Sequence, residues 1–189
     1  MRDVEREVVR ALKAGEGDYR EQDIERIQFQ DCDLSGQSFF QASLENVVFT
    51  RCNLSLVDFR HARLQAVRFV ECKLVGIPFL NADPFALEIH FQSCKLISCN
   101  FGGMRLRKAA FRDCDLQDCA FIGSDMAEAD FSRSIFRGSE FNGTDLRKAD
   151  FRGAAGYRIN PLNNKVRKAR FDLPEVLSLL EFLDIEITP

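Results

Sequence analysis

Residues 29–49 read FQDCDLSGQSFFQASLENVVF, and this stretch decides the fold. Its large apolar residues stand at every fifth position and alternate between Phe and Leu: Phe29, Leu34, Phe39, Leu44 and Phe49. A period of five fits neither the 3.6-residue period of a helix nor the two-residue alternation of a flat strand. The spacing therefore predicts a repeat architecture in which one five-residue unit is used many times.

The same rhythm extends over most of the chain. It runs from Ile24 to Phe79 and resumes from Phe91 to Phe151. A small or β-branched residue stands two positions before most of these centres, and the other three positions are mostly polar. Each unit is therefore expected to bury one large and one small side chain. The predicted core ladder includes Phe29, Leu34, Phe39, Leu54, Phe59, Phe111, Leu116 and Phe121.

The unit resembles that of the pentapeptide-repeat family, which is A(D/N)LXX. The units Ala-Asp-Phe-Ser-Arg at 129–133 and Ala-Asp-Phe-Arg-Gly at 149–153 follow this pattern. The resemblance covers about residues 22–153. It implies an all-β solenoid, a right-handed quadrilateral β-helix with four units per coil, over residues 21–171. A loop is expected near 156–165, within the last partial coil.

The cysteines provide a test of the four-unit coil. Cys32, Cys52 and Cys72 are spaced by twenty, so they should stack on one face. The same count places the Phe centres on two opposite faces and the Leu centres on the other two. Facing side chains of different size in this way can fill a core evenly.

The rhythm slips once, because Phe79 and Phe91 are twelve residues apart. If Pro84 holds the intervening centre, a two-residue bulge lies near 83–88. Counting across it keeps Cys94 and Cys114 in line with the earlier cysteines. This continuity predicts a local bulge inside one domain.

Composition narrows the function classes. The chain has 189 residues and a formal net charge of −3, which gives no strong attraction to nucleic acid or to anionic lipid. No apolar run approaches the ~20 residues that a membrane helix needs. The charged start, from Arg2 to Glu7, argues against a signal peptide. We expect a cytoplasmic protein that makes no direct nucleic-acid or membrane contact.

The sequence contains little that indicates a catalytic site or a metal-binding site. All seven cysteines occupy the small inward position, and their odd number favours free thiols. Zinc needs thiolates that converge from several directions, and a column along one face does not converge. His61 and His90 fall on opposite faces by the repeat count. No phosphate-binding glycine loop or nucleophile elbow is present. We predict no cofactor, no metal and no enzymatic activity.

Both ends of a stacked rod need caps. Val4, Val8 and Leu12 form an apolar stripe that predicts a helix over about residues 4–14, within a cap at 1–20. Residues 172–189 predict a short helix followed by a strand, in which Ile185 and Ile187 alternate with acids. This tail carries more apolar surface than one rod end can cover, which predicts a homodimer. The predicted interface consists of Leu177, Leu180, Leu183, Ile185 and Ile187.

The C-terminal tail, residues 172–189, makes the chain resemble one subgroup of the family in particular. The segment from Lys168 to Ile187 and the stretch Cys52–Phe59 look most like pentapeptide-repeat proteins that protect DNA gyrase, namely the Qnr, mycobacterial Mfp and albicidin-resistance proteins. The resemblance implies a type II topoisomerase as partner, bound either by DNA mimicry or by docking through loops. The alternative is a generic protein–protein interaction scaffold or regulator with another partner.

Two sets of residues are candidates for partner binding. Asp113, Asp115 and Asp118 lie in an acid-rich stretch that could imitate DNA, although residues 22–156 hold 18 acidic and 16 basic residues. Phe85 and Leu87 lie in the bulge, and loops on rigid scaffolds often carry function. Other apolar residues at outward positions are Phe40, Leu56, Val75, Leu80 and Ile97.

Overall fold

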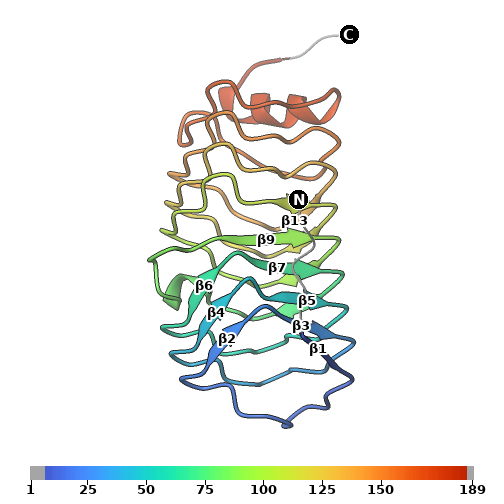
Figure 1. Ribbon diagram of the computed structural model, residues 1–189. Helices are drawn as coiled ribbons and strands as arrows, with labels where there is room; N and C mark the ends of the chain where they lie inside the picture. The colour runs from blue at the N-terminus through green and yellow to red at the C-terminus, as the bar shows by residue number, and fades with distance from the viewer. Residues whose placement is uncertain (1–6, 187–189) are drawn as a thin grey trace.

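The structure is a computed structural model, and it describes residues 7–186. The chain winds into a β-solenoid of about seven turns, seen from the side in Figure 1. Short parallel strands and bridges stack up four faces, and residues twenty apart pair with each other, as Phe29 does with Phe49. The predicted all-β solenoid is confirmed.

The four faces follow one another along each coil. The first face is a six-stranded sheet of β1 (Glu7–Arg10), β3 (Ile27–Gln30), β5 (Val48–Thr50), β7 (Val67–Val70), β9 (Ile89–Gln92) and β11 (Phe111–Arg112). The second face carries β8 (Lys73–Val75), β10 (Lys95–Ile97), β12 (Asp115–Gln117) and β13 (Ile135–Arg137). Single bridges such as Ser38–Asp58 hold the third face, which also contains the 3₁₀ turn η1 (Phe79–Asn81). The fourth face carries β2 (Asp23–Glu25), β4 (Ser43–Glu45) and β6 (Arg63–Gln65).

The core is built from two stacks of aromatic rings, one behind the first face and one behind the third. In the first stack the rings of Phe91 and Phe111 are 4.9 Å apart, and in the second those of Phe101 and Phe121 are 5.2 Å apart. Rings of the two stacks meet edge to face, as Phe101 and Phe111 do at 5.3 Å. Offset stacking and edge-to-face contact are both favoured by the electric quadrupole of the aromatic ring. All eight residues of the predicted ladder are buried.

The predicted N-terminal helix is wrong over the residues that the structure describes. Glu7–Arg10 form strand β1, in which Val9 pairs with Phe29 in the register of the repeat. A strand forms here because the edge of β3 would otherwise be open, and β1 forms hydrogen bonds with the unpaired N–H and C=O groups of that edge. Tyr19 continues the second aromatic stack and lies 4.8 Å from Phe39. The solenoid therefore starts before residue 21. The first part of the predicted helix lies outside the described residues.

The C-terminal end agrees with the expectation only in part. The helix η2 (Glu175–Leu183) is present, is of the 3₁₀ type, and lies across the last coil in Figure 1. The predicted strand is not formed at residues 184–186, where Asp184 adopts a left-handed conformation with φ 50°. An isolated strand has no neighbour that could satisfy its backbone groups. Ile187 lies outside the described residues.

The structure has two extra residues between Asp83 and Ile89, and Leu87 rather than Pro84 packs against the core. Val67 pairs with Ile89, so the register grows by two residues here. Pro84 is exposed, whereas Leu87 packs against the core. Glu88 then donates its N–H to the carbonyl of Leu64 at 2.8 Å. The chain therefore leaves the wall after Asp83 and returns with Leu87.

The seven cysteines are free and buried, as predicted. Those of the main column stay in line across the bulge, because the N–H of Cys72 points at Sγ of Cys94 at 3.4 Å. Burial raises the pKa of the Cys94 thiol to about 12, which keeps it protonated and unreactive. No helix in the described part of the chain is long and apolar enough to cross a membrane.

Candidate partner-binding site

The bulge presents an exposed aromatic side chain beside an apolar hollow. Phe85 is 78% exposed, the largest exposed fraction among the large hydrophobic residues described. A hollow of about 430 Å³ lies beside it, at the edge between the third and fourth faces. It is lined by Leu80, Ala82, Pro84, Phe85, Leu87, Gly102, Gly103, Met104 and Arg105. Exposed apolar groups next to a concavity are typical of protein-binding sites.

Local contacts hold the bulge loop to the wall. Asp83 accepts the N–H of Phe85 at 2.8 Å and pairs with Arg63 at 3.4 Å. Ala86 takes a left-handed conformation with φ 53°, which turns the chain back so that Leu87 can enter the core. Phe85 is therefore presented outward from a loop that is fixed at both ends. Of the two predicted bulge residues, Phe85 is on the surface, and Leu87 is half-buried beneath it.

The lining also contains residues outside the two sets predicted to bind a partner. Leu80 is 43% exposed and stands at an outward position of the repeat. Met104 and the adjacent glycines come from the next coil. That they lie beside the bulge can be worked out only when the register of the coils across the bulge is known. Arg105 places a cation at the rim, and its side chain forms no ion pair among residues 7–186. An apolar pocket with one cation at its edge can accept an apolar side chain that is flanked by an acid.

The predicted acidic cluster is largely neutralised. Asp113 accepts two hydrogen bonds from Arg133, at 2.6 and 2.8 Å, and this guanidinium lowers the pKa of the carboxyl group. Asp115 accepts a single hydrogen bond from a terminal nitrogen of Arg137, which lies in the next coil. Asp118 forms no ion pair in the described part of the chain. Its carboxylate lies where a Cβ on Gly138 would be only 2.3 Å away, so the glycine makes room for it.

Pairs of this kind cover much of the rod. Arg51 reaches Asp31 across one coil at 2.6 Å, and within single coils Arg147 and Arg152 pair with Asp145 and Asp150, each at 2.6 Å. Exposed pairs contribute little to stability, roughly 0–1 kcal/mol each. Their effect here is on the electrostatic potential at the surface, because the carboxylates of these pairs each have a guanidinium beside them. Where these pairs lie, the surface carries both signs of charge side by side.

The tail exposes an apolar face. Leu177, Leu183 and Ile185 are 42%, 39% and 55% exposed, and Leu180 is half-buried. Leu173, which the sequence analysis did not assign to the interface, is 77% exposed. Leu179 faces the rod and is the buried residue of η2. The predicted interface residues that the structure describes are thus accessible in the single chain.

The structure also shows how the potential metal ligands are distributed. Residues 7–186 contain no cluster of three or more His, Cys, Asp or Glu side chains that could hold a metal ion. His61 packs edge to face on Phe40, while His90 lies on the first face beside Glu88. The hydroxyl of Tyr157 is the one buried side-chain polar atom without a hydrogen-bond partner among the described residues, and the ring that carries it packs against the rings of Phe151 and Phe171.

Comparison with protein families agrees with this geometry. Residues 22–84 match the model "pentapeptide repeat region", and residues 88–119 and 114–153 match the model "pentapeptide repeats (8 copies)". The chain belongs to the pentapeptide-repeat family. Residues 85–87, in the bulge, lie outside the matched ranges. No curated protein sequence matches the chain.

Solved structures of other proteins resemble this chain. A trypsin-treated variant of QnrB1, a plasmid-mediated fluoroquinolone resistance protein, is 21% identical over 97% of this chain and 99% of that one, with a TM-score of 0.56. A second trypsin-treated variant is 19% identical over 97% and 98%, with a TM-score of 0.53. HetL from the cyanobacterium Nostoc sp. strain PCC 7120, involved in heterocyst differentiation regulation, is 17% identical over 81% and 87%, with a TM-score of 0.39. For the two QnrB1 structures, at identities of 21% and 19%, the similarity concerns the fold alone.

Proposed function

We propose that this chain is a non-enzymatic binding protein that docks on a type II topoisomerase through the bulge loop. The observation that carries the proposal is Phe85, 78% exposed on a fixed loop beside an apolar hollow. Aromatic side chains that enter a partner's pocket commonly supply most of the binding free energy at an interface. The topoisomerase is favoured by the resemblance of the tail to gyrase-protecting pentapeptide-repeat proteins.

Docking is favoured over DNA mimicry by the charge distribution. A duplex carries about one negative charge per 1.7 Å of axis. On this rod the carboxylates of Asp113 and Asp115 are paired with Arg133 and Arg137, and only Asp118 of the predicted cluster is unpaired among the described residues. A partner that binds DNA through its continuous negative potential would find positive and negative charges side by side on this part of the rod.

A second candidate function is an interaction scaffold for another protein. The mixed surface charge and the apolar hollow support it equally, because neither feature is specific for a topoisomerase. The two functions share the docking site and differ in the partner. An assay with a purified topoisomerase separates them.

We also propose that the rod is a homodimer through its tail. Leu177, Leu183 and Ile185 are exposed on one end of the rod, and Leu173 adds to them. Burial of apolar surface supports association at about 25 cal/mol per Å². A two-fold axis at the tail would give one rod of about twice the length, with two copies of the bulge loop.

The test is a supercoiling assay with purified DNA gyrase, with and without ciprofloxacin, titrated with the protein. We expect either relief of drug inhibition or inhibition of supercoiling at micromolar protein. No effect in either arm, together with no co-purification of gyrase or topoisomerase IV subunits, would contradict the topoisomerase proposal and leave the scaffold function.

A further inference from the structure

A recurring surface pattern on this rod places an Arg two residues after an Asp, and the two side chains pair. The pairs are Asp18–Arg20, Asp58–Arg60, Asp145–Arg147 and Asp150–Arg152, with distances of 2.6 to 2.9 Å. On the first face the segment Ala110-Phe111-Arg112 has the Arg but not the Asp. The next two units on this face, at 129–131 and 149–151, read Ala-Asp-Phe, so Ala110 stands where the carboxylate is missing.

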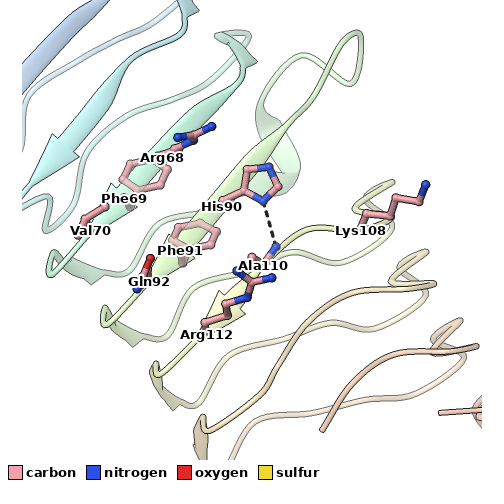
Figure 2. Close-up of a pocket in the computed structure, with 9 residues that line it drawn as sticks. All are labelled: Arg68, Phe69, Val70, His90, Phe91, Gln92, Lys108, Ala110 and Arg112. Atoms are coloured by element: carbon pink, nitrogen blue, oxygen red, sulfur yellow. Dashed lines mark hydrogen bonds between the residues drawn. The ribbon is translucent and has the colours of Figure 1, made fainter. Parts of the chain in front are cut away.

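A hollow of about 300 Å³ lies over Ala110, and Figure 2 shows its lining. Ala110 bridges to Asp130 on one side, and on the other side its backbone N–H donates to Nδ1 of His90 at 3.1 Å. In the next two coils the equivalent N–H groups, of Asp130 and Asp150, donate to the carbonyls of Ala109 and Ala129, each at 2.9 Å. The imidazole therefore replaces a backbone acceptor at this point and forms one wall of the hollow.

Cations dominate the remaining walls. Arg68 and Lys108 line the hollow, and neither side chain forms an ion pair or side-chain hydrogen bond among residues 7–186. Arg112 donates through Nε to Asp130 at 2.5 Å, which leaves its terminal nitrogens available. One further acid faces the site: Glu88 contacts Nε2 of His90 at 3.2 Å, and its side chain is 60% exposed.

We propose that the hollow over Ala110 binds a carboxylate side chain of the protein partner. Asp150 and Arg152 show how an Arg at this repeat position pairs with a carboxylate, because Nε and the terminal nitrogen of Arg152 hold the two carboxylate oxygens at 2.9 and 2.6 Å. Nε of Arg112 is already bound to Asp130, so a carboxylate that enters over Ala110 meets the terminal nitrogens of Arg112, and Arg68 and Lys108 line the same hollow. Charge-assisted pairs of this kind are among the stronger hydrogen bonds in proteins. This inference rests on the proposed function, since it specifies an acidic group on the partner.

The test uses a capped triglutamate peptide as the probe and a capped triglutamine peptide as its uncharged control, at constant ionic strength. Amide NMR spectra of the full chain report binding through the signals of Ala110, His90 and Arg112. We expect saturable shifts with triglutamate and none with triglutamine. Replacing both Arg68 and Lys108 with Ala should weaken binding about tenfold, a loss of about 1.4 kcal/mol. Glu88→Gln should strengthen it, because a like charge at the rim is removed.

Two variants make the test specific. Ala110→Asp creates the Asp-x-Arg pattern that Asp150 and Arg152 form two coils further on, so it should fold normally, place its own carboxylate in the hollow and abolish binding. Lys168→Ala removes a cation at the same repeat position as Lys108 but three coils away, and should change nothing. Equal shifts in Ala110→Asp and wild type would overturn the proposal. Tighter binding of inorganic phosphate than of triglutamate would also overturn it, in favour of a phosphate site.

The outcome is independent of the topoisomerase. A protein that binds gyrase but not triglutamate would retain the proposed function and lose this inference. A protein that binds triglutamate over Ala110 but no topoisomerase would retain the site and require another partner.

Discussion

Val67 pairs with Ile89, twenty-two residues away, although the preceding pair on the same sheet, Val48 with Arg68, spans twenty. The two extra residues are absorbed entirely between Asp83 and Ile89, since the next pair, Phe91 with Phe111, spans twenty again. The wall on both sides of the bulge is therefore continuous. The solenoid carries an outward loop without losing its register.

This relationship predicts opposite effects for two neighbouring substitutions. Phe85→Ala should change the free energy of unfolding by no more than about 0.5 kcal/mol, because the ring is mostly in water. Leu87→Ala should lower it by about 1–3 kcal/mol, because this side chain packs against the core. Denaturant unfolding followed by far-UV circular dichroism measures both. A larger loss for Phe85→Ala than for Leu87→Ala would contradict the assignment of outward and inward positions.

The repeat could be predicted from the sequence because its signal is local. Phe29, Phe49 and Phe69 alternate with Leu centres at a fixed spacing, and that spacing alone sets which side chains stack. The position of Leu87 could not be predicted, because Pro84 occupies the expected centre in the count and the choice depends on how the loop closes. Strand β1 was missed because Val4, Val8 and Leu12 also fit a helix, and only the open edge of β3 decides between the two.

The candidate site was predictable only in part. Phe85 stands out in the sequence as an aromatic residue in an irregular stretch, and the structure places it on the surface. The pairing of Asp113 with Arg133 was not anticipated, because those residues are twenty apart and the interpretation counted charges without assigning them to neighbouring coils. The hollow over Ala110 depends on what surrounds a missing side chain, and this too requires the register.

If the partner binds through the bulge loop, removing the charges of the acidic cluster should have little effect on the affinity for gyrase. The triple variant Asp113→Asn, Asp115→Asn and Asp118→Asn removes the charges that mimicry would use. We expect its affinity for gyrase to stay within about twofold of wild type, since two of the three carboxylates are already paired with Arg. Biolayer interferometry at two salt concentrations measures this. A tenfold or larger loss of affinity would restore the mimicry mechanism.

We predict that replacing Tyr157 with Phe does not destabilise the fold and can stabilise it. Its hydroxyl is buried without a partner among the described residues, and burial raises the pKa of this phenol to about 12. An unpaired buried polar group costs roughly 1–3 kcal/mol, so Tyr157→Phe should leave the free energy of unfolding unchanged or raise it by up to about 1 kcal/mol. Ser178→Ala is the contrast, since Ser178 donates to the carbonyl of Glu175 at 2.8 Å and its loss should destabilise. A destabilised Tyr157→Phe would indicate that the hydroxyl has a partner in solution.

The tail predicts the oligomeric state. Sedimentation velocity at tens of micromolar should show a dimer for the wild type. The double variant Leu180→Asp and Leu183→Asp should be monomeric, because two charges would be placed in an apolar interface. Leu56→Asp, at an exposed position on a regular coil, is the matched control and should stay dimeric. A monomeric wild type would remove the dimer proposal.

The central claim is that the bulge loop docks on a type II topoisomerase, and direct binding measures it best. Purified gyrase is titrated against immobilised wild type, Phe85→Ala and Leu56→Ala, the last removing another exposed apolar side chain from a regular coil. We expect saturable binding by the wild type and by Leu56→Ala, and at least a tenfold weaker affinity for Phe85→Ala, as for a residue at the centre of an interface. Equal affinities of wild type and Phe85→Ala would contradict docking through the loop.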